Sequence, residues 1–316
     1  MTELATYDSF PRYLAAKKSV DDRALNPRAW GALSRAVDRQ APLRVLEVGA
    51  GIGTMVERLI DGEVLHHAAY TAIDARAENI HHARQRLSAW GRERSFTVAE
   101  TTTGLILDRG TDHLTLELEA IDLFDFIRRE RGKNTWDLLA AHAFLDLVDV
   151  PSTLPQLFSL LSDGGLFYFT LNFDGLSAFL PELDPQLDEH IIRLYHRTMD
   201  ERVVNGASSG DSCTGRHLLA RLVQAGVQIL EAGASDWVVY PSNGGYPGDE
   251  AYFLHFIINT VHSALAGHAE LEAERLSAWT AQRHAQVERG ELVYIAHQLD
   301  ICGYAKPSQH SAVTFI

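Results

Sequence analysis

Blocks of apolar residues with two different spacings follow one another along the chain. A short apolar run at 43–48 ends where a group of glycines begins, and apolar residues at helical spacing follow from Met55 to Ile60. The continuous run is typical of a buried strand in a parallel sheet, whereas the helical spacing indicates an amphipathic helix. The order strand, glycine turn, helix places free helix amide groups over the turn, where a nucleotide can bind.

The same alternation continues toward the C-terminus. Apolar runs predict further core strands at 69–74, 136–141, 166–171, 227–231 with an extension at 235–240, and 292–299. Helical spacing predicts helices between these strands, at 78–90, 154–161 and a segment that begins near 212. Strands that alternate with helices indicate an α/β fold with a doubly wound sheet.

The third core strand has two candidate positions. Residues 96–100 have the composition of a strand, and residues 114–121 alternate apolar and polar side chains after the turn signal Arg109-Gly110. We therefore expect a β-hairpin insertion at 104–119. Either choice leaves Asp122 directly after a strand.

Long segments lie outside this pattern, so we expect extra elements to surround the core. Connections in compact domains usually run about 2–6 residues, far fewer than these segments contain. The predicted organisation is an N-terminal helical lid at 1–42, a core at 43–175, a cap insertion at 176–211, a core continuation at 212–248, a helical cap insertion at 249–290, and a final strand and tail at 291–316.

The glycine turn carries the most specific motif of the chain. Its pattern is Glu47-x-Gly49-x-Gly51-x-Gly53, and Thr54 stands where a dinucleotide fingerprint requires its third glycine. An acid at position 47 repels a pyrophosphate and attracts an ammonium group, directly or through water. This pattern argues against a nicotinamide-dependent oxidoreductase. It resembles the motif of class I S-adenosylmethionine (SAM) dependent methyltransferases.

Acids after the next two strands extend the resemblance. Asp74 is placed to accept hydrogen bonds from ribose hydroxyls, and Asp122 resembles the family's acid that contacts the adenine amino group. The resemblance also implies cofactor contacts from Ala50 beside the glycines, from Ala75, and from Leu123 near the adenine ring. The alternative for each single acid is a helix N-cap or a solvated loop end.

The resemblance implies a mostly parallel seven-stranded sheet with helices on both faces, and a SAM-dependent methyltransferase. We expect an in-line displacement in which an oxygen, nitrogen or carbon of a small-molecule acceptor takes the methyl group. His142, just after the fourth strand, is the first candidate for a catalytic base, followed by His196 or His255. A lone histidine is more often a hydrogen-bonded structural group, so that alternative stays open.

The N-terminal helices of resembling enzymes close over the cofactor. This implies that Tyr7 or Tyr13 lines the pocket and that Arg23 or Arg28 meets the cofactor carboxylate. The alternative is a helix that only buries its aromatic stripe. In the second cap, Tyr252, His255, Asn259 and His262 share one helical face, which favours a pocket wall or a partner-facing surface over a metal site.

Composition restricts the partners. The 316 residues are 46% hydrophobic and carry a formal net charge of −14, so a nucleic-acid groove is disfavoured while small uncharged or cationic substrates fit. Two cysteines, Cys213 and Cys302, are too few for a disulfide scaffold and have no metal-ligand neighbours. With no signal segment and no apolar run long enough for a membrane span, we expect a cytoplasmic protein without a membrane partner.

Three questions stay open at this stage. A non-catalytic SAM-binding regulator and a methyltransferase acting on proteins are alternatives to a small-molecule enzyme. The helical insertions also leave a homodimer possible. Fold can be inferred from pattern, but the acceptor must be inferred from the site.

Overall fold

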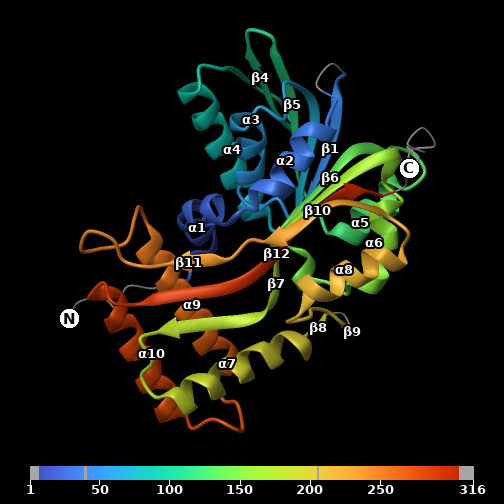
Figure 1. Ribbon diagram of the computed structural model, residues 1–316. Helices are drawn as coiled ribbons and strands as arrows, with labels where there is room; N and C mark the ends of the chain where they lie inside the picture. The colour runs from blue at the N-terminus through green and yellow to red at the C-terminus, as the bar shows by residue number, and fades with distance from the viewer. Residues whose placement is uncertain (1–6, 39–40, 205, 306–316) are drawn as a thin grey trace, which may run out of the picture.

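A mixed sheet of ten strands runs through the molecule (Figure 1). The computed structural model describes residues 7–38, 41–204 and 206–305. In spatial order the strands are β10 (Gln228–Ala234), β12 (Val293–Tyr304), β7 (Leu161–Leu180), β6 (Trp136–His142), β1 (Leu43–Val48), β2 (His67–Asp74), β5 (Asp112–Ala120), β4 (Gly104–Arg109) and β3 (Thr97–Glu100), with β11 (Trp237–Val239) paired to β12. The short strands β8 (Val203–Val204) and β9 (Ala207–Ser208) pair separately.

The doubly wound α/β fold is confirmed. The five central strands, β7, β6, β1, β2 and β5, pair in parallel, and β12 and β10 continue the sheet antiparallel. Ten strands replace the expected seven because β3 and β4 extend one edge and β11 is a separate strand beside β12. The third core strand is β5, since it pairs in parallel with β2 from His67 to Asp74. The expected hairpin exists, with β4 and β5 as its antiparallel arms.

Helices connect the strands and cover the sheet. Their bounds are α1 (Phe10–Ala24), α2 (Pro27–Ala36), α3 (Thr54–Asp61), α4 (Ala77–Glu93), α5 (Leu123–Glu130), a 3₁₀ turn η1 (Leu145–Leu147), α6 (Val150–Phe158), α7 (Pro185–Asp200), α8 (Thr214–Gln224), α9 (Glu250–Leu265) and α10 (Ala273–Glu288). None of these helices, within the described ranges, is long and apolar enough to cross a membrane.

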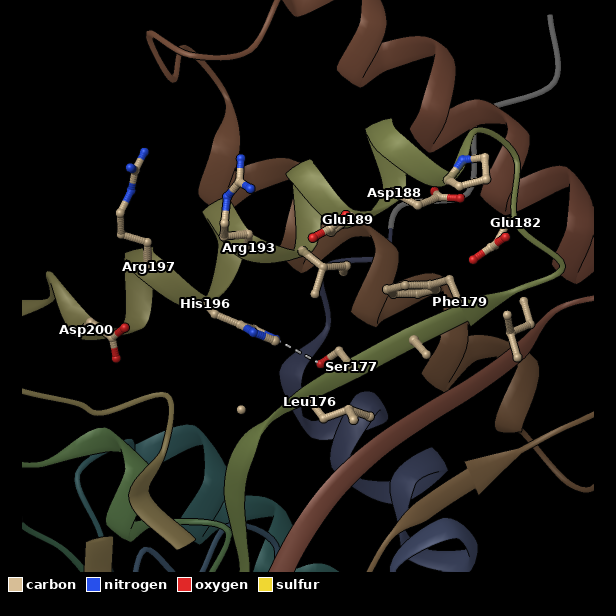
Figure 2. A pocket seen from close by; sticks show the side chains of 15 residues that line it. Leu176, Ser177, Phe179, Glu182, Asp188, Glu189, Arg193, His196, Arg197 and Asp200 are labelled. Atoms are coloured by element: carbon tan, nitrogen blue, oxygen red, sulfur yellow. Dashed lines mark hydrogen bonds between the residues drawn. The ribbon is translucent and has the colours of Figure 1, made fainter. Parts of the chain in front are cut away.

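Two long strands carry the cap. The expected core boundary at residue 175 falls inside a strand, because β7 continues to Leu180 and pairs there with Val293 of β12. Helices α7, α9 and α10 gather around this extension, away from the parallel centre (Figure 1). Figure 2 shows α7 lying along β7, with Phe179 and His196 pointing into the space between them. The N-terminal α1 joins this unit, since Tyr13 stacks on Phe256 with ring centroids 4.1 Å apart.

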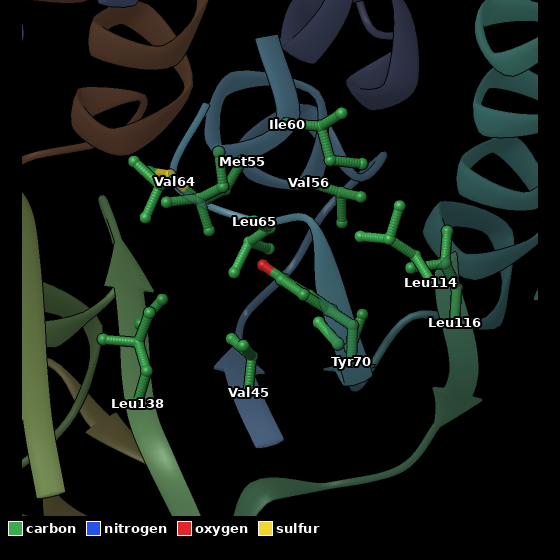
Figure 3. Close-up of a cluster of buried hydrophobic side chains, with 14 of the residues drawn as sticks. Val45, Met55, Val56, Ile60, Val64, Leu65, Tyr70, Leu114, Leu116 and Leu138 are labelled. Carbon is green, nitrogen blue, oxygen red and sulfur yellow. The ribbon is translucent and has the colours of Figure 1, made fainter. Parts of the chain in front are cut away.

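Both faces of the central sheet are buried, as a continuous apolar run requires. Along β1, Val45 packs into a cluster with α2, α3 and α4, whereas Leu46 and Val48 pack into a second cluster with α5, α6 and α8. Figure 3 shows the first cluster, where Tyr70 of β2 points toward side chains of α3. The two clusters hold the strand ends in place, and the loops at these ends form the site.

Candidate functional site

A cavity of about 710 Å³ lies at the carboxyl ends of the central strands. Its walls come from the glycine turn after β1, the segments after β2, β5 and β6, and the cap elements α1, α7, β11 and α9. In open α/β sheets ligands bind at these strand ends, near the change in strand order. The predicted residues that line the cavity are Glu47, Gly49, Ala50, Gly51, Asp74, Ala75, Asp122, Leu123 and His142.

The glycines divide into two roles. Gly49 has φ +67°, and a Cβ on it would lie 2.3 Å from Cδ2 of Phe144, which also lines the cavity. Gly53 has φ +79°, but its Cβ would meet Leu87 of α4 at 2.8 Å, and Gly53 is not among the lining residues. The expectation of a cofactor contact at Gly53 is therefore corrected. Gly53 instead lets α3 begin close to α4.

Asp74 joins the glycine turn to the second strand. Its carboxylate accepts hydrogen bonds from the Gly51 amide at 2.9 Å, from the Arg76 amide at 2.8 Å and from the Asn79 side chain at 3.1 Å. A carboxylate has about four acceptor sites, so capacity for a ribose hydroxyl remains. Replacing Asp74 would therefore disturb both the glycine turn and the binding of a ribose at this carboxylate.

Asp122 fits both of the interpretations that the sequence left open. Its Oδ1 accepts from the amides of Phe124 and Asp125, at 2.8 and 3.3 Å, and so caps the N-terminus of α5. The residue also lines the cavity next to Leu123. A helix cap fixes the direction of the carboxyl group, which leaves its second oxygen for a ligand.

Glu47 is buried at the floor of the turn, with 2% of its surface exposed. It accepts a hydrogen bond from the Tyr70 hydroxyl at 2.7 Å. Burial raises the pKa of Glu47 to about 8, against the opposing effects of the Tyr70 hydrogen bond and Arg58. This raised pKa favours the protonated carboxyl group at neutral pH, whereas a ligand ammonium group would favour its ionised form.

The structure corrects the expected role of Arg23. Its guanidinium binds both carboxylate oxygens of Glu250, at 2.6 and 2.9 Å, and it does not line the cavity. Arg28 is likewise outside the lining and lies 3.6 Å from Glu231. On α1 the positions that face the cavity are Phe10, Tyr13, Leu14, Lys17 and Asp21, which follow one another at spacings of three or four along one face of the helix. Arg23 lies on a different side of α1, and that side faces α9.

Lys17 and Asp21 are functional candidates that the sequence reading missed. Asp21 Oδ2 lies 2.5 Å from Lys17 Nζ, 3.0 Å from His142 Nε2 and 3.4 Å from Arg58 Nη2, and its Oδ1 accepts from Trp237 Nε1 at 2.9 Å. Burial alone would raise the pKa of Asp21, but Lys17, His142 and Arg58 hold it well below its usual range. The sequence signal for this pair was that Lys17 and Asp21 lie four residues apart on a helix that also carries aromatic side chains.

Both ring nitrogens of His142 have protein partners. Nδ1 lies 2.7 Å from Thr170 Oγ1, and Nε2 lies near Asp21 and 3.1 Å from Arg58 Nη1. Burial, followed by the positive charge of Arg58, lowers the pKa of His142 to about 4 although Asp21 opposes this. The neutral ring lines the cavity, but it would have to release a partner to accept a substrate proton. Its role as a base remains a prediction.

The other candidate bases lie outside this cavity. A second hollow of about 810 Å³ lies between α7 and the extension of β7. Figure 2 shows His196 on the wall of this hollow, pointing toward Ser177. His196 Nε2 is 3.2 Å from Ser177 Oγ, and Ser177 lines both hollows. His255 Nδ1 lies 2.7 Å from Nδ1 of His284, and Tyr7 stacks on His255 at 4.2 Å. Neither His255 nor Tyr7 lines the first cavity, whereas Tyr13 does.

In the described part of the chain, no group of three or more His, Cys, Asp or Glu side chains is placed to hold a metal ion. Both cysteines, Cys213 and Cys302, are free thiols.

Residues 46–167 match a family described as a methyltransferase domain. The chain contains a methyltransferase domain. The match spans the glycine turn, Asp74, Asp122 and His142, which are the parts of the cavity built by the central strands. The cofactor is SAM, and the residues that line the cavity fit it: Glu47 would hold its ammonium group, Asp74 its ribose, and Asp122 with Leu123 its adenine.

Solved structures similar to this chain at low identity include methyltransferases. One is a SAM-dependent methyltransferase from Thiobacillus denitrificans in complex with S-adenosyl-L-homocysteine. It is 17% identical, covers 92% of this chain and 98% of its own length, and has a TM-score of 0.43. Another, a putative sarcosine dimethylglycine methyltransferase from Galdieria sulphuraria, is 11% identical, with 93% and 86% covered and a TM-score of 0.42. These likenesses are too weak to carry an argument about the acceptor. No curated relative matches the sequence.

Proposed function

We propose that this methyltransferase transfers the methyl group of SAM to a small-molecule acceptor held under the helical cap. The observation that carries the proposal is the cavity of about 710 Å³ that continues from Gly49 at the glycine turn to Phe256 in the cap. A volume of this size is within the range of small-molecule sites. The acceptor side is lined by residues of α1, α7 and α9, so a small molecule bound there would be held between these helices.

The chain's own residues would supply positioning and exclusion of water. SAM supplies an electrophilic methyl group on a positively charged sulfur. That charge is lost as the methyl moves, so a dry cavity with aligned reactants lowers the barrier. Phe144 packs over Gly49, and Leu171 and Phe173 of β7 close the side of the cavity beyond His142.

The first test is the identity of the cofactor and of the acceptor class. Calorimetry should show binding of SAM and S-adenosylhomocysteine but not of NADH. With methyl-labelled SAM, the label should enter the dialysable small-molecule fraction of a cell extract. Label in the protein fraction would instead support a protein acceptor, and cofactor binding without transfer to either fraction would support a regulatory protein.

The role of His142 can be tested separately. His142→Gln keeps a hydrogen-bonding side chain but removes the titrating ring. If His142 only positions Asp21 and Thr170, turnover with the identified acceptor keeps its pH profile, whereas loss of kcat with a changed profile would support the base role. Asp21→Asn is the matched variant, since it disturbs the same network without touching the ring.

A further inference from the structure

The acceptor side of the cavity is unusually rich in rings. Beyond the cofactor residues, the aromatic side chains that line it are Phe10, Tyr13, Phe173, Tyr195, Trp237, Phe256 and Tyr294. They come from α1, β7, α7, β11, α9 and β12, so the rings surround the space from several directions. The faces of aromatic rings carry partial negative charge and attract cations.

One acid in this aromatic wall has a carboxyl oxygen without a hydrogen-bond partner. Asp146 lies in η1, two residues after Phe144, and lines the cavity. Its Oδ1 is buried and has no hydrogen-bond partner among the described residues. Burial raises the pKa of Asp146, and its carboxyl group is near enough to contribute to the pKa shifts of Lys17 and Tyr195. A buried carboxyl oxygen without a donor is costly unless a ligand supplies that donor.

The positive side chains near the cavity are already engaged. Among its described lining residues the lysines and arginines are Lys17 and Arg76. Lys17 binds Asp21 at 2.5 Å, and the guanidinium of the exposed Arg76 lies 4.4 Å from the ring centroid of Phe10. Arg202, whose charge opposes the effect of burial on the pKa of Asp146, is not among the lining residues. An anionic acceptor would therefore find no unengaged cation among the described lining residues and would lie next to the Asp146 carboxyl group.

A second polar group faces the same space. Gln298 of β12 is 2% exposed, lines the cavity, and its Oε1 has no hydrogen-bond partner in the described chain. A buried amide oxygen without a partner is a rare feature in a folded protein. Its oxygen can accept from an N–H group, as Asp146 can.

We propose that the acceptor is an organic amine that enters as its ammonium ion, bound by the aromatic wall and by Asp146, which takes its proton. This inference rests on the proposed function and names the acceptor class for the same site. A protein with a net charge of −14 also attracts a cationic substrate at long range.

The reaction then balances without any further reagent. The ammonium group gives one proton to the Asp146 carboxylate, which frees the nitrogen lone pair. That pair forms the new N–CH₃ bond while the S–CH₃ bond breaks and its electrons stay on sulfur, producing S-adenosylhomocysteine. The product is a methylated ammonium ion, and Asp146 releases its proton to solvent when the product leaves.

The experiment measures binding to the complex with S-adenosylhomocysteine, using three probes of matched shape. They are N,N-dimethyl-2-phenylethylamine, its carbon isostere (3-methylbutyl)benzene and the anion 3-phenylpropionate. Calorimetry should give a Kd for the amine at least about tenfold lower than for the other two. Asp146→Asn should raise the amine Kd by about tenfold or more and leave that of the hydrocarbon unchanged.

Asp125→Asn is the matched control. Asp125 lies on α5, outside the cavity, where it pairs with Arg128 at 2.5 Å at an exposed position. Binding of S-adenosylhomocysteine by both variants verifies that they fold. Equal or tighter binding of the hydrocarbon or the anion, a preference for the amine that survives Asp146→Asn, or binding of none of the probes would overturn the inference.

Failure of the two proposals can be told apart. If S-adenosylhomocysteine itself does not bind, the proposed function fails and the inference fails with it. If the complex forms and a phenol or a carboxylic acid is methylated while amines are not, the proposed function stands and only the amine assignment falls.

Discussion

Replacing Gly49 by alanine is expected to damage cofactor binding more than any comparable change in the glycine turn. Gly49 has φ +67°, a conformation that L residues rarely adopt. The new Cβ would lie 2.3 Å from Cδ2 and 2.9 Å from Cγ of Phe144, well inside the usual carbon contact of about 3.5–4.0 Å. The Phe144 ring must therefore move, and it lines the cavity at this point.

The expected cost has two parts. Left-handed backbone costs about 1–2 kcal/mol for a residue with a Cβ. Displacing a packed ring adds about 1–3 kcal/mol, the usual range for overpacking. The free energy of unfolding should thus fall by about 2–5 kcal/mol. Because the displaced ring borders the cofactor space, the Kd for S-adenosylhomocysteine should rise about tenfold or more, which corresponds to about 1.4 kcal/mol.

Alanine substitutions at two other glycines separate the cost of the left-handed backbone from the cost of displacing the Phe144 ring. Gly53→Ala combines φ +79° with a contact of 2.8 Å to Leu87, away from the cavity, so it should destabilise similarly and change the Kd by less than about threefold. Gly110→Ala, at φ +59° with nothing within 4 Å of its Cβ, should show only the backbone cost of about 1–2 kcal/mol.

The assay pairs denaturant unfolding with calorimetric titration of S-adenosylhomocysteine. The reasoning fails if the Gly49 variant binds as tightly as the Gly53 variant at equal stability. It also fails if the Gly110 variant alone loses as much stability as the Gly49 variant, since the contact with Phe144 would then contribute nothing.

Three further predictions concern charged groups. Arg23→Ala should lower the free energy of unfolding by about 1–2 kcal/mol. This loss is smaller than for a fully buried ion pair because Arg23 is half exposed. The affinity for the cofactor should not change. Asp74→Asn should raise the Kd for S-adenosylhomocysteine at least about tenfold by calorimetry, since the amide replaces an acceptor oxygen with a donor. Glu47→Gln should flatten the pH dependence of the free energy of unfolding, measured without added ligand, between pH 4.5 and about 8.

The sign of the Glu47 effect follows from proton binding. Its pKa is about 8 in the folded protein and 4.5 in the unfolded chain, so between these values the folded state binds more protons and stability falls as pH rises. His142, lowered to about 4, acts in the opposite direction below its usual value of 6.5. The measured quantity is therefore the difference between variant and wild type, and a difference that does not change with pH would contradict the assignment.

Each of the charge predictions has its own contrary result. Weaker cofactor binding after Arg23→Ala would restore the role expected from the sequence. Unchanged binding after Asp74→Asn would remove the ribose site from this carboxylate.

The outcome for the cap shows what kind of information a sequence lacks. The sequence pattern placed the core boundary at residue 175, yet β7 runs on to Leu180 because β12 lies beside it and pairs with it. The partner strand begins at Val293, far away in the chain. No local pattern around Gly175 contains that pairing.

The sequence by itself determined the central strands, the glycine turn and the acids at strand ends. Those features depend on neighbours within a few residues: an apolar run, a helical period, a spacing of two between glycines. Tertiary structure alone decided which stripe of α1 faces the cavity. The bond between Asp21 and His142 joins residues 121 apart, and that between Arg23 and Glu250 joins residues 227 apart. Such contacts form only when the cap folds back over the sheet, so spacing along the chain cannot reveal them.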